Sequence, residues 1–184
     1  MTRVLGPESR FTPPADWCQS PQRWHSTDAD STEVEVTELV AAMVRALQPD
    51  LVVETGTAWA QTAGAIGEAL ARNGHGRLVT CEPDPVRHAF CVDAVKSLPV
   101  TVVKGQSLEL VPDGPVGFAW LDSLPNLRIP EFRHLRQWLS PGAVVGFHDT
   151  APHKKLHRWL ARTDAEMVRL NLRTPRGVTF AQVR

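Results

Sequence analysis

The chain has 184 residues, of which 20 are basic and 20 are acidic, so its formal net charge is zero. A chain of this length can bury about 70% of its unfolded surface without disulfides or metals, which suits one domain. The neutral balance gives no overall field that would attract nucleic acid, and the apolar runs are far shorter than a membrane span. Cys18, Cys81 and Cys91 follow no paired or metal-binding spacing and no signal peptide is evident, so we expect reduced thiols and a cytoplasmic protein.

Residues 1–30 are rich in proline and polar side chains and have no regular apolar period. This composition predicts an irregular arm. Trp17 and Trp24 argue against free disorder of the arm, although tryptophans more often pack in a core than line a substrate site. We expect the arm to act as a lid over a substrate cleft, and residues 31–184 to form a single domain.

Helical and strand-like patterns alternate along the rest of the chain. Residues 32–47 have apolar side chains at helical spacing and stop before Pro49, which predicts an amphipathic helix packed on a sheet. The run at 51–53 is apolar on both faces, as expected for a central parallel strand. Further strands are predicted at 78–81, 100–103, 116–121 and 143–147, with helices at 61–72, 86–95, 130–139 and 154–161.

Two late apolar runs, at 167–172 and 178–183, are joined by a short link that contains turn residues. Such a link predicts an antiparallel pair. Strands that alternate with helices predict a parallel sheet. The chain is therefore expected to have an α/β fold, with a mostly parallel seven-stranded sheet, helices on both faces and an antiparallel pair at its C-terminal end.

An acid and a glycine follow the first predicted strand. Glu54, Gly56 and Thr57 stand where this strand would end, directly before a helix. In open α/β sheets, ligands bind at the carboxyl ends of the strands. Gly56 lets the backbone approach a ligand closely because it has no side chain, and the helix that begins near Gln61 offers unpaired amides that suit a negative group. The turn is predicted to bind a ligand.

Glu82 follows the second strand, where a carboxylate would accept hydrogen bonds from both hydroxyls of a ribose. Free ribose hydroxyls fit NAD or an adenosyl cofactor. A dinucleotide fingerprint needs GxGxxG, but here Ala58 and Gln61 follow Gly56 at the other two positions. Glu54 would also repel a pyrophosphate, whereas it suits the amino acid end and sulfonium of S-adenosylmethionine (SAM). The residues favour SAM over NAD.

The chain resembles the class I SAM-dependent methyltransferases, and among them the small O-methyltransferase-like families that begin with VExG. The resemblance covers residues 34–183 and implies a Rossmann-like fold. The order and spacing of its pieces are more specific than any one of them. They are ETGTAWAQT (54–62), TCEPDP (80–85), GQS (105–107), FAWLDS (118–123), SPGAVVGFHDT (140–150) and TPRGVTFAQV (174–183).

The resemblance also implies how the cofactor is held. The first motif would hold its methionine part, the acid after the second strand its ribose, and the segment after the third strand its adenine. Ala60 stands where the family often has another glycine, which crowds the loop. The residues expected to contact the cofactor are Glu54, Gly56, Thr57, Thr62, Glu82, Gln106 and Ser107, although Thr62 could equally cap a helix and the last two could be plain loop residues.

Asp122 and Asp149 follow the fourth and fifth strands, so their carboxylates should emerge at one edge of the sheet. With water and a substrate hydroxyl they would form an oxygen shell for Mg²⁺, which would lower the pKa of the hydroxyl and orient it. Relatives that use a metal have an Asp-Asn pair after the fifth strand, but here Thr150 replaces the Asn and a third strong ligand is lacking. The alternative is that Asp149 caps the next helix.

His148 directly precedes Asp149, beside the expected position of the methyl group. A histidine of near-neutral pKa could take the proton of the acceptor hydroxyl as the general base. Alternatively, His148 is a partly buried residue that bonds to its own loop. His153 is expected to belong to a solvated basic helix face. The predicted catalytic residues are His148, Asp149 and Asp122.

The sequence thus predicts a SAM-dependent methyltransferase that acts on a hydroxyl of a small molecule, with Mg²⁺ assistance as an option at Asp122 and Asp149. The protein would mainly supply proximity and orientation. A non-catalytic adenosyl-ligand binding or scaffold protein is the alternative, consistent with Ala60 and the missing third metal ligand. An NAD-dependent oxidoreductase is less favoured. A homodimer is an option that no sequence feature decides.

Overall fold

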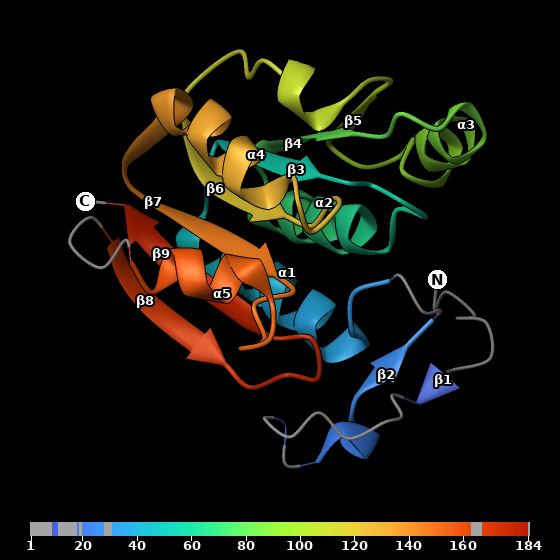
Figure 1. The fold of residues 1–184 in the computed structure, drawn as a ribbon. Helices are drawn as coiled ribbons and strands as arrows, with labels where there is room; N and C mark the ends of the chain where they lie inside the picture. Colours follow the sequence, from blue (N-terminus) through green and yellow to red (C-terminus); the bar gives the residue numbers. More distant parts are fainter. Residues whose placement is uncertain (1–8, 11–17, 19, 28–30, 163–166, 184) are drawn as a thin grey trace.

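Seven strands form one sheet in the part of the chain that the computed structural model describes, which is residues 9–10, 18, 20–27, 31–162 and 167–183 (Figure 1). The order of the strands is β5-β4-β3-β6-β7-β9-β8. The strands are β3 (Leu51–Thr55), β4 (Arg77–Cys81), β5 (Val100–Val103), β6 (Val116–Leu121), β7 (Leu139–His148), β8 (Met167–Leu172) and β9 (Val178–Val183).

The five strands from β3 to β7 run parallel, whereas β9 pairs antiparallel with both β7 and β8. The sequence order β3, β4, β5 runs outward from the middle of the sheet in one direction, and β6 and β7 continue in the other. Strand order therefore reverses between β3 and β6, which is where open α/β sheets bind their ligands. The predicted seven-stranded sheet with a C-terminal antiparallel pair is confirmed.

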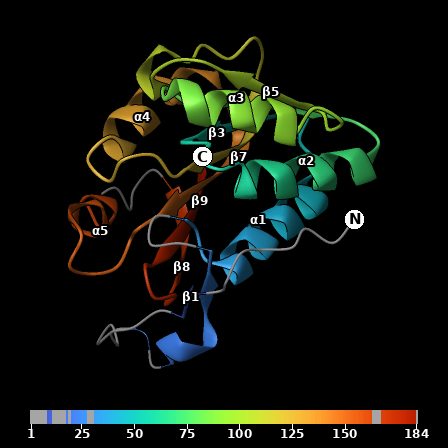
Figure 2. The same ribbon diagram turned by 90° about the vertical axis from the view of Figure 1, so that its right-hand side faces the viewer.

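Helices cover both faces of this sheet. Figure 2 shows α4 (Arg128–Leu135) and α5 (Lys155–Leu160) on one side, and α1 (Val34–Leu47) and α2 (Gln61–Asn73) on the other. Because side chains alternate along a strand, Phe118 and Trp120 pack with α1, α2 and α3 (Pro85–Ala94), while their neighbours in β6 pack with α4 and α5. All five residues of β3 are buried, as predicted for a central strand.

The largest differences from the predicted element boundaries lie between residues 128 and 148. The helix expected at 130–139 begins at Arg128, because Pro130 lies in the first turn, where a missing N–H costs nothing. That helix ends in a 3₁₀ turn at Arg136–Trp138, and Leu139 already belongs to β7. The expected strand at 143–147 is therefore the second half of a ten-residue strand.

The arm predicted to be irregular contains two short strands, β1 (Ser9–Arg10) and β2 (His25–Ser26), which pair antiparallel, and a 3₁₀ turn at Pro21–Arg23. Trp24 packs against the core beside α1, whereas Trp17 lies outside the described residues. The lid function of the arm stays a prediction. Among the helices described, none has the length and apolar character needed to cross a membrane.

Candidate functional site

The turn from β3 into α2 lies tightly against the end of β6. Gly56 has a φ of +83°, and a Cβ added to it would lie 2.8 Å from the carbonyl oxygen of Asp122 and 2.8 Å from Cα of Ser123. Only glycine fits both the space and the backbone conformation. Ala58 and Ala60 also have positive φ angles. The side chain of Ala60 packs in the buried core, so it does not crowd the open side of the turn.

Glu54 lies in the protein interior, at the end of β3. Its side chain is only 1% exposed, and it accepts a 2.6 Å hydrogen bond from the hydroxyl of Thr80. Burial raises the pKa of Glu54 to about 8. The hydroxyl of Thr57 lies 2.7 Å from the same Thr80 hydroxyl. Glu54 does not line either of the cavities described below, and its contact with a cofactor stays a prediction.

Glu82, in the second predicted motif (80–85), hydrogen-bonds to the backbone of the first (54–62). Its carboxylate accepts hydrogen bonds from the backbone N–H of Ala58, from that of Asp84 and from Nε of Arg87, each at 3.0 Å. Glu82 is buried, but it lines the cavity at this edge of the sheet. A carboxylate has about four acceptor positions, so one remains for a ligand hydroxyl.

A cavity of about 340 Å³ connects the ends of β3, β4, β6 and β7. It brings together six of the predicted site residues. Its walls also include an apolar loop, formed by Leu124, Pro125 and Leu127. The predicted residues that line this cavity are Gly56, Glu82, Gln106, Ser107, Asp122 and Asp149.

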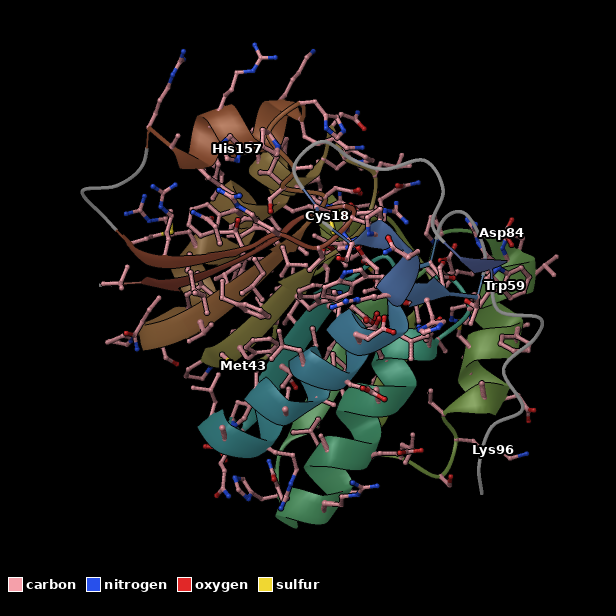
Figure 3. All side chains as sticks on the ribbon, turned by 90° about the horizontal axis from the view of Figure 1, so that it is seen from below. Cys18, Met43, Trp59, Asp84, Lys96 and His157 are labelled. Atoms are coloured by element: carbon pink, nitrogen blue, oxygen red, sulfur yellow. The ribbon has the colours of Figure 1, made fainter. Side chains whose placement is uncertain are left out.

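Thr57 and Thr62 line a second, much smaller cavity of about 30 Å³. The two cavities share Gly56, Ala58 and Asp122, so they adjoin at the β3–α2 turn. Trp59, which Figure 3 labels at the edge of the molecule, also borders the smaller cavity and is 47% exposed. Its ring meets that of Phe90 edge to face, with centroids 5.4 Å apart. Trp59 thus packs on Phe90 with one part of its ring and is exposed with the rest.

His148 lies behind the cavity wall and has no exposed surface. Its Nδ1 atom is 2.8 Å from Asp122 and its Nε2 atom is 2.7 Å from Glu33. Burial opposes a charge on the ring, but the two carboxylates outweigh it and raise the pKa of His148 to about 9. Both ring nitrogens already contact carboxylates and the ring does not line the cavity, so in this arrangement His148 does not reach an acceptor hydroxyl. The role of His148 as general base stays a prediction.

Arg128 was not singled out from the sequence, yet it lies at the centre of the site. Its side chain is 1% exposed. Nη1 donates to Asp149 at 2.8 Å and Nη2 donates to Asp122 at 2.7 Å. Nη2 also donates to the carbonyl oxygen of Ser123, and Nε donates to that of Leu121. The guanidinium thus bridges the carboxylates at the ends of β6 and β7.

Arg176, in the turn between β8 and β9, also lines the cavity. Its Nε atom donates to Asp149 at 3.1 Å. Burial would raise the pKa of Asp149, but His148, Arg128 and Arg176 outweigh it and hold this pKa well below the usual range of a carboxyl group. The pKa of Asp122 is likewise lowered against the effect of burial, chiefly by His148.

Glu33 is the third residue of the site that sequence reasoning missed. It is fully buried, and one carboxylate oxygen accepts from the hydroxyl of Thr174 and from the backbone N–H of Arg176, both at 3.1 Å. Its other oxygen accepts from His148. The hydroxyl of Thr32 donates to Asp122. Thr32 and Glu33, which directly precede α1, therefore hydrogen-bond to residues at the carboxyl ends of β6 and β7.

Asp122, His148 and Asp149 each offer an atom close enough to the others to share a metal ion, with all three atoms within 4.8 Å. These atoms are already bonded, however. Both oxygens of Asp149 accept from arginines, and the oxygens of Asp122 accept from Arg128, His148 and Thr32. As arranged, these residues do not fit the oxygen shell that Mg²⁺ prefers.

A nucleotide-type cavity at the switch point of a mostly parallel sheet, with a C-terminal antiparallel pair, places the fold among Rossmann-like α/β proteins. The family described as "Methyltransferase domain" matches residues 53–150, which is more than half of the chain. The chain therefore belongs to this methyltransferase family. No curated protein matches its sequence significantly.

Solved structures of similar fold include the O-methyltransferase from Bacillus cereus in complex with S-adenosylhomocysteine (SAH), at 16% identity and a TM-score of 0.73, over 85% of this chain and 84% of that chain. TomG, an O-methyltransferase of tomaymycin synthesis from Streptomyces achromogenes in complex with SAM, has 17% identity and a TM-score of 0.71, over 84% and 82%. SAH-bound PaMTH1 from Podospora anserina has 16% identity and a TM-score of 0.71, over 86% and 81%. At such identities these likenesses confirm the fold.

Proposed function

We propose that this methyltransferase binds SAM in the 340 Å³ cavity and transfers its methyl group to a hydroxyl of a small molecule. The observation that carries the proposal is the lining of this cavity, which joins the glycine turn, Glu82 and the 106–107 segment to the strand-end carboxylates. The solved O-methyltransferases of similar fold, with SAM or SAH bound, support the choice of cofactor and reaction.

In this proposal the residues on one side of the cavity hold the cofactor. The methionine part would lie against Gly56, which lines the cavity and whose turn packs closely on the end of β6. Glu82 would accept from a ribose hydroxyl, since its three protein donors leave an acceptor position open. Gln106 and Ser107, at the start of the 3₁₀ turn Ser107–Glu109, would flank the adenine.

The other side of the cavity would hold the acceptor. Bound SAM would supply the methyl group on a sulfonium, which is its own leaving group. Leu124, Pro125 and Leu127 give this side an apolar wall. Arg128 and Arg176 both pair with Asp149 at the border of the cavity and so fix that carboxylate in place. The chain would thus mainly orient the acceptor.

The experiment that tests the cofactor is calorimetric titration of SAH and of NAD into the protein. We expect SAH to bind and NAD not to bind. Glu82→Gln should weaken SAH binding by roughly tenfold or more, because a hydrogen bond to a charged group is worth about 1.5–3 kcal/mol. Glu68→Gln, at an exposed position of α2, is the matched control and should leave SAH binding unchanged. Binding of NAD alone, or of neither ligand, would contradict the proposal.

A second candidate function is the binding of an adenosyl ligand without turnover. The sealed position of His148 and the pairing of both strand-end carboxylates with arginines favour it. Incubation with methyl-labelled SAM and a panel of phenols, catechols and hydroxy acids separates the two. Label transferred to an acceptor supports the transferase, whereas SAH binding without transfer to any acceptor supports the second candidate.

We further propose that the protein works in a reducing compartment such as the cytoplasm. Cys18 and Cys81 are buried thiols, and Cys91 is buried where its thiol donates to the carbonyl oxygen of Ala58. Cysteines that are kept as thiols are usual in a reducing compartment. Thiol titration of the unfolded protein, purified under alkylating conditions from its natural host, should find all three cysteines reduced. The partner of the proposed methyltransferase is a small-molecule acceptor. The homodimer stays a prediction.

A further inference from the structure

The guanidinium of Arg128 occupies the position between Asp122 and Asp149 where the sequence offered Mg²⁺ as an option. It makes four hydrogen bonds, two to the carboxylates and two to the backbone carbonyls of Leu121 and Ser123. All four are between 2.7 and 3.2 Å long. Because the guanidinium is planar and rigid, this set of bonds fixes the relative orientation of both carboxylates.

The charges of the site are already balanced. Glu33, Asp122 and Asp149 supply three negative charges to a buried network. Arg128 and Arg176 contact these carboxylates directly, and the ammonium of Lys154 lies 3.7 Å from Asp149, which gives three permanent positive charges. A divalent cation would add excess positive charge to this network, and it would lie beside two guanidinium groups.

The carboxylate oxygens that would bind a metal ion already accept hydrogen bonds from the protein. A carboxylate that ligates Mg²⁺ directs at least one oxygen to the ion at short range. Here each oxygen of Asp149 faces a guanidinium, and each oxygen of Asp122 has a donor from the protein. Thr150, which replaces the Asn of metal-using relatives, accepts a hydrogen bond from Thr179 instead. Arg128 and a metal ion are therefore alternatives for the same position.

We propose that Arg128 replaces a divalent metal ion in this chain. Its guanidinium holds Asp122 and Asp149 in place beside the acceptor, so the site works without a metal. Arg128 is a positioning residue, since it acts through the two carboxylates. The part of this inference that concerns the acceptor rests on the proposed function, whereas the exchange of metal for guanidinium does not.

The test is a titration of the protein with Mn²⁺, followed by the electron paramagnetic resonance signal of free Mn²⁺. The wild-type chain should not bind Mn²⁺ at one site per chain. Arg128→Met removes the charge while it keeps much of the side-chain length, and this variant should gain one Mn²⁺ site that Asp149→Asn then abolishes. Arg128→Lys keeps a cation and should not gain the site. Arg133→Met, on the exposed face of α4, is the matched control and should behave as wild type.

One-to-one binding of Mn²⁺ by the wild-type chain would overturn the proposal, and so would a folded Arg128→Met variant that gains no site. If circular dichroism shows that Arg128→Met is unfolded, the wild-type titration decides, with the absence of saturable binding as the supporting result. The titration needs no cofactor. Failure of SAH to bind would therefore contradict the proposed function and leave the Mn²⁺ result unaffected.

Discussion

The Nε2 atom of His148 lies 2.7 Å from a carboxylate oxygen of Glu33, although the two residues are 115 positions apart in the sequence. This contact joins the end of β7 to the residue before α1. Through its other oxygen, Glu33 also binds the turn between β8 and β9. A single buried carboxylate thus connects three segments around the candidate active site.

Replacement of Glu33 by glutamine should strongly destabilise the protein. The amide keeps the shape of the side chain but removes the charge that faces His148, and breaking a buried ion pair on one side costs about 3–5 kcal/mol. Equilibrium unfolding in urea measures the change. Glu38→Gln, at an exposed position of α1, is the control and should stay within about 0.5 kcal/mol of wild type. A loss below about 1 kcal/mol for Glu33→Gln would show that the pair contributes little.

The stability of the protein should fall as the pH rises from about 6.5 to about 9, in part because of His148. The pKa of its ring is 6.5 in the unfolded reference and about 9 in the folded protein. The ion pairs therefore contribute fully below pH 6.5, and the contribution is lost as the pH passes the folded pKa. Its size is on the order of 3 kcal/mol. His148→Gln should lack this part of the pH dependence in urea unfolding, and an unchanged slope in the variant would refute the assignment.

The fold follows from the sequence because each strand and helix carries a periodic apolar pattern. In β6, Phe118 and Trp120 alternate with Ala119 and Leu121, which face the opposite layer, and all four are buried. The site residues that follow a strand directly, such as Glu82, Asp122 and Asp149, could also be placed. Parallel strands end at one edge of the sheet, so their positions along the chain were sufficient.

The remainder of the site depends on side-chain direction, which periodicity does not encode. Both faces of β3 are buried, so no pattern shows that Glu54 points into the interior rather than toward the cavity. Arg128 and Arg176 reach the site with long side chains from a helix start and a hairpin turn, where charged residues are usually solvated. The ionic partners of His148 lie far apart in the sequence, so its raised pKa could not be predicted.

Glu54→Gln should stabilise the protein at neutral pH. The carboxyl group has a pKa of 4.5 in the unfolded reference and about 8 in the folded protein. Since the folded pKa is the higher one, stability is greatest below pH 4.5 and is lost as the pH rises toward 8. At pH 7 the penalty is on the order of 2–3 kcal/mol. Glutamine needs no deprotonation and can still accept from Thr80, so its melting temperature at pH 7 should be higher by several degrees. A melting temperature equal to or below that of wild type would show that the Glu54 carboxyl does not destabilise the folded protein at pH 7.

Gly56→Ala should damage both stability and SAH binding, and Gly74→Ala separates the two causes. Both glycines have φ angles near +80°, so alanine at either position costs about 1–2 kcal/mol of backbone strain. A Cβ at Gly74 would meet nothing within 4 Å, whereas one at Gly56 would lie 2.8 Å from the backbone of Asp122 and Ser123. Backbone atoms at the end of β6 cannot move without shifting Asp122 and its bond to Arg128.

Urea unfolding should therefore show a larger loss for Gly56→Ala, and calorimetry should show weaker SAH binding for this variant alone. Equal losses in the two variants would mean that the turn can move away from β6, and that Gly56 is required only for its backbone conformation.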